Sequence, residues 1–156
     1  NIRMTEALIF IGCPQIPVQS PLVLYIADYL RDAKLTPVVA ANPSAKQLVK
    51  VSDPKGHYVS EYRDLEKTVA DMSEGKTSYP LIISLVHNDA GLTFTATAAA
   101  VSPQSTIVTV FFGEHAYELA DEAEYATEKI TAPLTHNVRG IIPHLEEVLE
   151  WAVSKI

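Results

Sequence analysis

The residues of this sequence that could do chemistry lie directly after its apolar, strand-like runs. Cys13 is the single cysteine and follows the first run, and His87 follows a later one. A histidine near a thiol favours the thiolate, the reactive form of cysteine. The pair therefore predicts an enzyme or carrier that uses Cys13 as a thiolate. The alternative is that Cys13 is a small buried apolar residue, which is the commoner role of a lone cysteine.

Other polar residues occupy equivalent positions after the apolar runs. The carboxyl ends of parallel strands meet at one edge of a sheet, where α/β proteins bind their ligands. The candidate ligand-binding residues are Gly12, Gln15, Asn42, His57, Tyr58, Asn88, Asp89 and His115. Two alternatives stay open: ordinary loop polarity, and a helix-capping role for Asn88 or Asp89.

Several familiar kinds of site are absent from the sequence. Gln19 stands where a low-molecular-weight tyrosine phosphatase would need an arginine six residues after its cysteine. Neither a G-x-x-x-x-G-K-[ST] loop nor a G-x-G-x-x-G fingerprint occurs. No close pair of metal ligands such as H-x-x-x-H occurs either, so we expect no metal site. The sequence identifies no cofactor.

Four apolar runs predict the strands that must position these residues. The runs alternate with helical patterns, as in a parallel sheet covered on both faces. They are Ala7–Ile11, Pro37–Ala41, Leu81–Val86 and Ile107–Phe112, and Glu128–Thr131 is a candidate edge strand. We expect one α/β domain over residues 1–156. It should be a three-layer α/β/α sandwich with a mainly parallel, flavodoxin- or Rossmann-like sheet in the order 2-1-3-4-5, which places Cys13 beside His87.

Cap residues followed by proline predict two helix starts. Ser20-Pro21 opens a helix to about Ala33, and Asn42-Pro43 opens one to about Ser52. Apolar spacing places a third helix from about Leu65 to the stop signal Gly75. Further helices are expected over residues 90–101, 114–123 and 141–154. Residues 124–140 show the weakest secondary-structure pattern in the sequence.

The segment Asp53–Tyr58 is rich in turn-forming residues and has no helical or strand period. Because it carries His57 and Tyr58, we expect it to form a lid over the ligand site.

The first predicted helix is apolar on every side. Over Leu22–Leu30 almost its only polar residue is Asp28, and a helix that is apolar all round must be buried all round. We therefore expect a homodimer that buries Leu22–Leu30.

Composition restricts the partners. The chain has 156 residues, 47% hydrophobic and 20% charged, which is typical of a globular protein. Its longest apolar stretch, Pro21–Ala27, is too short to span a membrane, so we expect a cytoplasmic protein. Residues 79–156 carry 3 Lys and Arg against 10 Asp and Glu, the whole net charge of −7. This acidity disfavours nucleic acid. The acidic helix is either a solvated surface or a docking surface.

A set of short motifs resembles an uncharacterised archaeal family of small α/β proteins from methanogens, a domain of unknown function. The motifs are Gly12-Cys13-Pro14, Pro17-Val18-Gln19 with Pro21-Leu22 and Tyr25, Asn42-Pro43, Leu48-Val49, Val51, Asp53-Pro54, Gly56, Tyr58 and Asn88-Asp89-Ala90. The resemblance covers residues 6–100. It implies a three-layer α/β/α sandwich and a possible role linked to methanogenesis, and it brings no activity with it.

Three functions are compatible with these observations. The first is a module that binds a small polar ligand or cofactor fragment at the carboxyl edge of the sheet. The second is an enzyme or carrier that uses Cys13 as a thiolate. The third is a structural subunit that docks through its acidic helix. The sequence does not decide whether the protein is an enzyme.

Overall fold

The computed structural model describes residues 4–156 and shows one sheet of parallel strands. The strand order is β3-β2-β1-β4-β5-β6. The predicted order 2-1-3-4-5 is confirmed, since the predicted strands correspond to β2, β1, β4, β5 and β6. The strand bounds are β1 Glu6–Ile11, β2 Thr36–Ala41, β3 Glu61–Asp64, β4 Leu81–Val86, β5 Thr106–Phe111 and β6 Glu128–Thr131.

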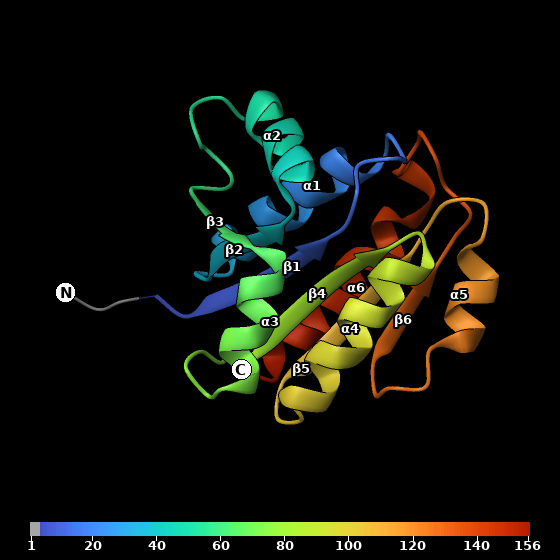
Figure 1. Cartoon of the computed structure of the whole chain (residues 1–156). Helices are drawn as coiled ribbons and strands as arrows, with labels where there is room; N and C mark the ends of the chain where they lie inside the picture. The colour runs from blue at the N-terminus through green and yellow to red at the C-terminus, as the bar shows by residue number, and fades with distance from the viewer. Residues whose placement is uncertain (1–3) are drawn as a thin grey trace.

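Helices cover both faces of this sheet (Figure 1), which gives the predicted three layers. Figure 1 shows α3 and α4 in front of the sheet and α6 behind it. Alternate strand residues point to opposite faces: Ile9 packs with the layer of α1, α2 and α6, and Phe10 packs with α3 and α4. The helix bounds are α1 Gln19–Asp32, α2 Pro43–Ser52, α3 Leu65–Ser73, α4 Asp89–Val101, α5 Ala116–Glu122 and α6 Ile142–Ser154, with the short 3-10 helix η1 Arg139–Ile141 before α6. No helix among residues 4–156 is long and apolar enough to cross a membrane.

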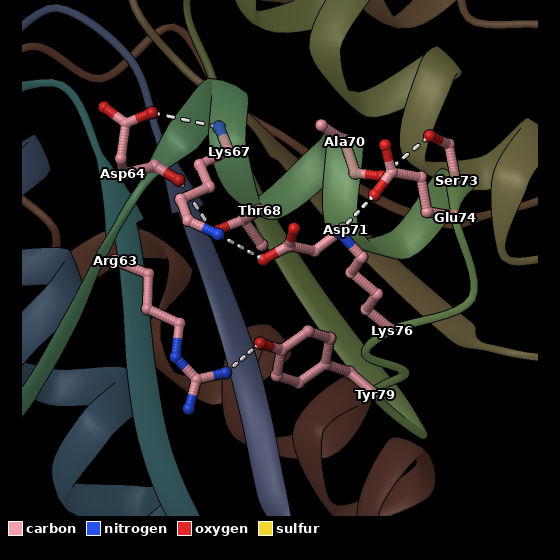
Figure 2. A network of polar contacts seen from close by, with 10 residues as sticks. All are labelled: Arg63, Asp64, Lys67, Thr68, Ala70, Asp71, Ser73, Glu74, Lys76 and Tyr79. Atoms are coloured by element: carbon pink, nitrogen blue, oxygen red, sulfur yellow. Dashed lines mark hydrogen bonds and ion pairs between the residues drawn. The ribbon is translucent and has the colours of Figure 1, made fainter.

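The edge strand β3 was not predicted. Its sequence, Glu-Tyr-Arg-Asp, contains no apolar run, and it pairs only with β2. The Arg63 guanidinium donates a hydrogen bond to the Tyr79 hydroxyl (Figure 2). It also donates to the carboxylate of Glu6, on β1, at 3.0 Å. Long-range contacts of one half-buried arginine therefore stabilise a strand whose local sequence has little strand character.

Side-chain caps account for three helix starts. Asn42 Oδ1 accepts from the backbone N–H of Ala45 at 2.9 Å, as predicted for α2. Asp64 caps α3 by accepting from Lys67 N at 2.9 Å (Figure 2). Asn88 caps α4. The helix predicted from Ser20 to about Ala33 corresponds to α1, Gln19–Asp32, but the predicted capping role of Ser20 is wrong, because α1 has no side-chain cap.

Helices of the same chain cover the apolar helix α1. Its residues Leu22, Ile26 and Leu30 lie in one core cluster with residues of α2 and α6. The Tyr25 hydroxyl donates to the Glu146 carboxylate on α6. These contacts contradict the reason for expecting a homodimer through Leu22–Leu30, because the apolar faces already have partners within the chain.

The segment between α2 and β3 lies at the amino edge of the sheet. After β2 the chain runs back along α2, and β3 then begins at Glu61, which pairs with Val38 near the start of β2. Cys13, by contrast, follows the end of β1. The prediction that Asp53–Tyr58 forms a lid over Cys13 is therefore wrong: His57 and Tyr58 lie at the opposite edge, since a helix that follows a parallel strand returns the chain to the strand starts.

One buried carboxylate organises this segment. Asp53 is 5% exposed, and it accepts hydrogen bonds from the backbone N–H groups of His57, Tyr58 and Val59 at 2.8, 3.1 and 3.0 Å. Burial acts to raise the pKa of Asp53, but these donors outweigh it and hold the pKa below its ordinary value. The segment is a fixed turn around a charged acceptor.

Asp53→Asn should lower the free energy of unfolding by about 2 kcal/mol at neutral pH, because a neutral amide accepts weaker hydrogen bonds from the buried N–H groups. The native pKa is lowered, so this stabilisation is present above the ordinary Asp pKa of 3.8 and is lost as the pH falls through the native pKa. Urea unfolding at neutral and acidic pH measures both effects. The exposed Asp32→Asn is the control, and equal stability of Asp53→Asn and wild type at neutral pH would contradict the assignment.

Candidate functional site

A histidine joins two strand ends at the carboxyl edge of the sheet. Because β1 and β4 are neighbours, Cys13 and His87 leave the sheet side by side, as predicted. His87 Nε2 donates a hydrogen bond to the Cys13 carbonyl oxygen at 2.8 Å. His87 is only 7% exposed, and its ring packs edge-on against Phe112 with ring centroids 5.3 Å apart.

This hydrogen bond decides the tautomer of His87. A carbonyl oxygen can only accept, so Nε2 carries the proton and Nδ1 of the neutral ring holds a lone pair. Within residues 4–156, Nδ1 has no hydrogen-bond partner. It is also not among the unpaired polar atoms that are fully enclosed. His87 therefore presents an acceptor that a bound molecule can reach.

The thiol of Cys13 faces a different neighbour. Cys13 is exposed, and its Sγ accepts a hydrogen bond from Asn42 Nδ2 at 3.3 Å. His87 contacts the backbone of Cys13, so the predicted contact between imidazole and sulfur is not formed. The alternative of a buried apolar cysteine is also wrong, because Cys13 lies in the exposed loop after β1. Asn42 serves both the thiol and the cap of α2.

The loop between β1 and α1 is held by backbone contacts as well. The backbone N–H of Gln15 donates to the Cys13 carbonyl at 2.9 Å, while the Gln15 residue itself is exposed. Gln19 Nε2 donates to the Gly12 carbonyl at 3.1 Å. The N–H of Val18 donates to the Thr135 carbonyl at 2.8 Å. Thr135 lies in residues 124–140, where the sequence showed the weakest secondary-structure pattern, so the hydrogen bond from Val18 to Thr135 was not predicted.

The space at the switch point between β1 and β4 is small. A cavity of about 10 Å³ lies beneath the strand ends, against Gly12, Leu65 and Gly91. A volume of this size holds about one water molecule.

A larger pocket lies one strand further along the edge. It has a volume of about 320 Å³ and opens between the start of α4 and helix α5. Its wall is formed by His87, Asn88, Asp89, His115, Glu118, Leu119 and Glu122. Predicted residues thus separate into two groups: His87, Asn88, Asp89 and His115 share this pocket, whereas Gly12, Cys13, Gln15 and Asn42 do not line it.

The pocket wall is acidic. It contains three carboxylates and no lysine or arginine. Glu118 accepts from His115 Nδ1 at 2.9 Å, and Asn88 Oδ1 is engaged as the cap of α4, where it accepts from Gly91 N at 2.9 Å. The side chains of Asp89 and Glu122 have no hydrogen bond or ion pair within residues 4–156. The sequence analysis did not single out Glu118 and Glu122, because a run of acidic residues on a helix is typical of a face exposed to solvent.

The described residues do not hold a preformed metal site. Among residues 4–156, no group of three or more His, Cys, Asp or Glu side chains is placed to bind one ion.

Comparison with known proteins shows which family shares this fold. Residues 8–148 match the model of DUF1890, a domain of unknown function. The chain belongs to the DUF1890 family. It is 29% identical over 147 residues to the uncharacterized protein MJ0452 of Methanocaldococcus jannaschii, covering 94% of this chain and 98% of that protein. It is also similar to the solved structure of MT0777, with a TM-score of 0.85, 32% identity and coverage of 94% and 97%.

The DUF1890 assignment confirms the predicted kind of family, an archaeal domain of unknown function. The match also extends further than the resemblance over residues 6–100, because it continues through the acidic C-terminal third to residue 148. The family therefore includes both sides of the pocket, the start of α4 and helix α5.

Gly113→Ala should lower the free energy of unfolding by about 1–2 kcal/mol, because Gly113 has a φ of +81° that L-residues adopt at a cost. Its N–H donates to the Leu134 carbonyl at 2.7 Å, so the turn after β5 depends on this conformation. Gly140→Ala is the matched control, since a Cβ there meets no atom within 4 Å. Thermal or urea unfolding compares the two, and equal losses would refute the role of Gly113.

Cys13→Ser should change the free energy of unfolding by less than about 0.5 kcal/mol, because the residue is exposed and such positions tolerate substitution. The native wild-type thiol should also react completely with a disulfide reagent without unfolding. Urea unfolding and a thiol titration of native and denatured protein measure these two effects. A strongly destabilised variant or a thiol that reacts only after unfolding would contradict the exposed placement.

Proposed function

We propose that this DUF1890 protein binds a small polar ligand at the carboxyl edge of its sheet, in the pocket between α4 and α5. The observation that carries the proposal is the pocket itself, whose wall includes the nearly buried His87 together with Asn88, Asp89 and His115 from neighbouring ends of the sheet edge. The Nδ1 of His87 has no partner within residues 4–156 and is not fully enclosed, so it is free to accept a hydrogen bond.

The size and composition of the pocket support this function. A volume of about 320 Å³ lies within the range of small-molecule sites. The wall combines one apolar contact, Leu119, with several polar groups, and such a mixture gives both affinity and orientation. The residues come from the ends of rigid elements, because α4 is capped by Asn88 and the turn after β5 is fixed by Gly113.

The other two functions have weaker support. Thiol chemistry at Cys13 gains an N–H donor from Asn42, but His87, the predicted base, donates to the backbone carbonyl instead. Docking through the acidic helix would use the outward side chains of α5, such as Tyr117, which is exposed. A link to methanogenesis is supported only by the methanogenic source of the relative, and it stays a prediction.

A fragment titration followed by ¹H–¹⁵N NMR tests the proposal. Cationic, neutral and anionic polar fragments in equal number are added to the labelled protein. Fragments that bind should shift the amide signals of Asn88–Gly91 and Ala116–Leu119 and leave those of His57 and Tyr58, at the opposite edge, in place. If no fragment of any charge shifts the pocket signals, or if the shifts gather at another surface, the proposed function is wrong.

A further inference from the structure

We propose that a groove along the outer face of α4 binds a second copy of this chain, which docks there through the outer face of its helix α2. The inference goes beyond the proposed function, because it concerns an interaction surface and not the small-molecule pocket. It starts from the composition of α4, which has no charged residue from Ala90 to Val101 although several of these residues are exposed.

The outer face of α4 is poor in free polar groups. The Thr93 hydroxyl donates to the Asp89 carbonyl at 3.0 Å, and the Thr97 hydroxyl donates to the Thr93 carbonyl at 2.9 Å. The helix itself therefore satisfies both hydroxyls, and their exposed neighbours Ala96 and Ala100 are apolar. An exposed helix face normally carries charged residues, whereas charged residues are depleted in the centre of a protein interface.

This face forms the floor of a groove. Two adjoining hollows, of about 530 and 300 Å³, follow α4 and share Ala96, Ala100 and Tyr125. The Tyr125 hydroxyl pairs with a threonine of β5 at 3.0 Å, which holds the ring in the wall of the groove. Glu122 and Glu124 line the larger hollow, and no lysine or arginine accompanies them. The groove is therefore apolar along its floor and acidic along one side.

The outer face of α2 has the complementary character. Leu48 and Val51 are 45% and 66% exposed, and their spacing of three residues places them side by side on the helix. Lys46 and Lys50 lie on the same helix, which contains no acidic residue. An apolar ridge with lysines beside it thus matches an apolar groove with glutamates beside it, and such matched potentials favour one orientation of docking.

The helix and the groove can meet only between two molecules. Val49 of α2 belongs to the core cluster on one face of the sheet, and Ala98 of α4 belongs to the cluster on the other face, in front of the sheet in Figure 1. A contact between the α4 grooves of two copies would oppose Glu122 and Glu124 with the same carboxylates, which is unfavourable. Docking of α2 is instead a heterologous contact that joins copies head to tail.

Sedimentation equilibrium of the intact protein tests the inference over a range from about 20 µM to about 1 mM, since one helix in one groove is a small interface and its association should be weak. The average mass should rise above that of the monomer as the concentration increases, and added salt should reduce the rise because it screens the charge pairs. A monomer at every concentration in low salt would overturn the inference.

Variants of each surface identify the contact. The ridge variant Leu48→Glu/Val51→Glu places carboxylates against the acidic groove, and the groove variant Ala96→Arg fills the floor. Each should weaken self-association at least tenfold without loss of folding, because exposed positions tolerate substitution. Met4→Glu/Ile156→Glu is the matched control, since these side chains are 44% and 49% exposed and the change in charge is the same. Equal losses in the control and the ridge variant would overturn the inference.

Mixing the two variants separates this contact from any other surface. The ridge variant keeps an intact groove, and the groove variant keeps an intact α2 face. Each variant alone should stay monomeric, whereas an equal mixture should form dimers that contain one molecule of each and nothing larger. A mixture that stays monomeric, or variants that still associate on their own, would show that the groove does not bind α2 of a second copy.

Discussion

The hydrogen bond from His87 to the Cys13 carbonyl is the constraint on which the carboxyl edge depends. It joins the ends of β1 and β4, residues 74 positions apart in the sequence, and the ring rests on Phe112 from the end of β5. One side chain therefore contacts three neighbouring strands of the sheet. Its position fixes the loop before α1, the tautomer of the imidazole and the direction in which the remaining ring nitrogen is available.

This constraint explains why the site lies where it does. In an open parallel sheet, ligands usually enter at the switch point, which here is the gap between β1 and β4. His87 links the ends of these two strands, and a cavity of only about 10 Å³ lies against Gly12, Leu65 and Gly91. A larger pocket opens between α4 and α5, where the sheet edge continues past β4. His87 is one of the residues that line this neighbouring pocket.

The two polar clusters at this edge have different chemistry. Around Cys13, an amide of Asn42 supports the sulfur and at the same time caps α2, so a structural need accounts for much of the arrangement. In the pocket, Asp89 and Glu122 have no partner within residues 4–156, and the accessible Nδ1 of His87 is also unpaired. The polar groups of the pocket are thus less engaged in holding the fold together than those around Cys13.

The sequence alone predicted the parallel sheet, because wholly apolar runs alternate with helical patterns. The order 2-1-3-4-5 was expected as the commonest one for five strands, and the meeting of Cys13 with His87 followed from that order. It also showed which residues follow strands. Only the tertiary structure decided the rest. β3 depends on the long-range contacts of Arg63, the segment after Asp53 is placed at the far edge by the return path of α2, and α1 is covered by α2 and α6 of the same chain. The pocket itself was beyond local patterns, because the acidic face of α5 becomes a wall only when packing brings it opposite the start of α4. The local sequence specifies the spacing of apolar residues in a helix or strand and roughly where that element ends. The partner of a side chain depends instead on residues that are distant along the chain.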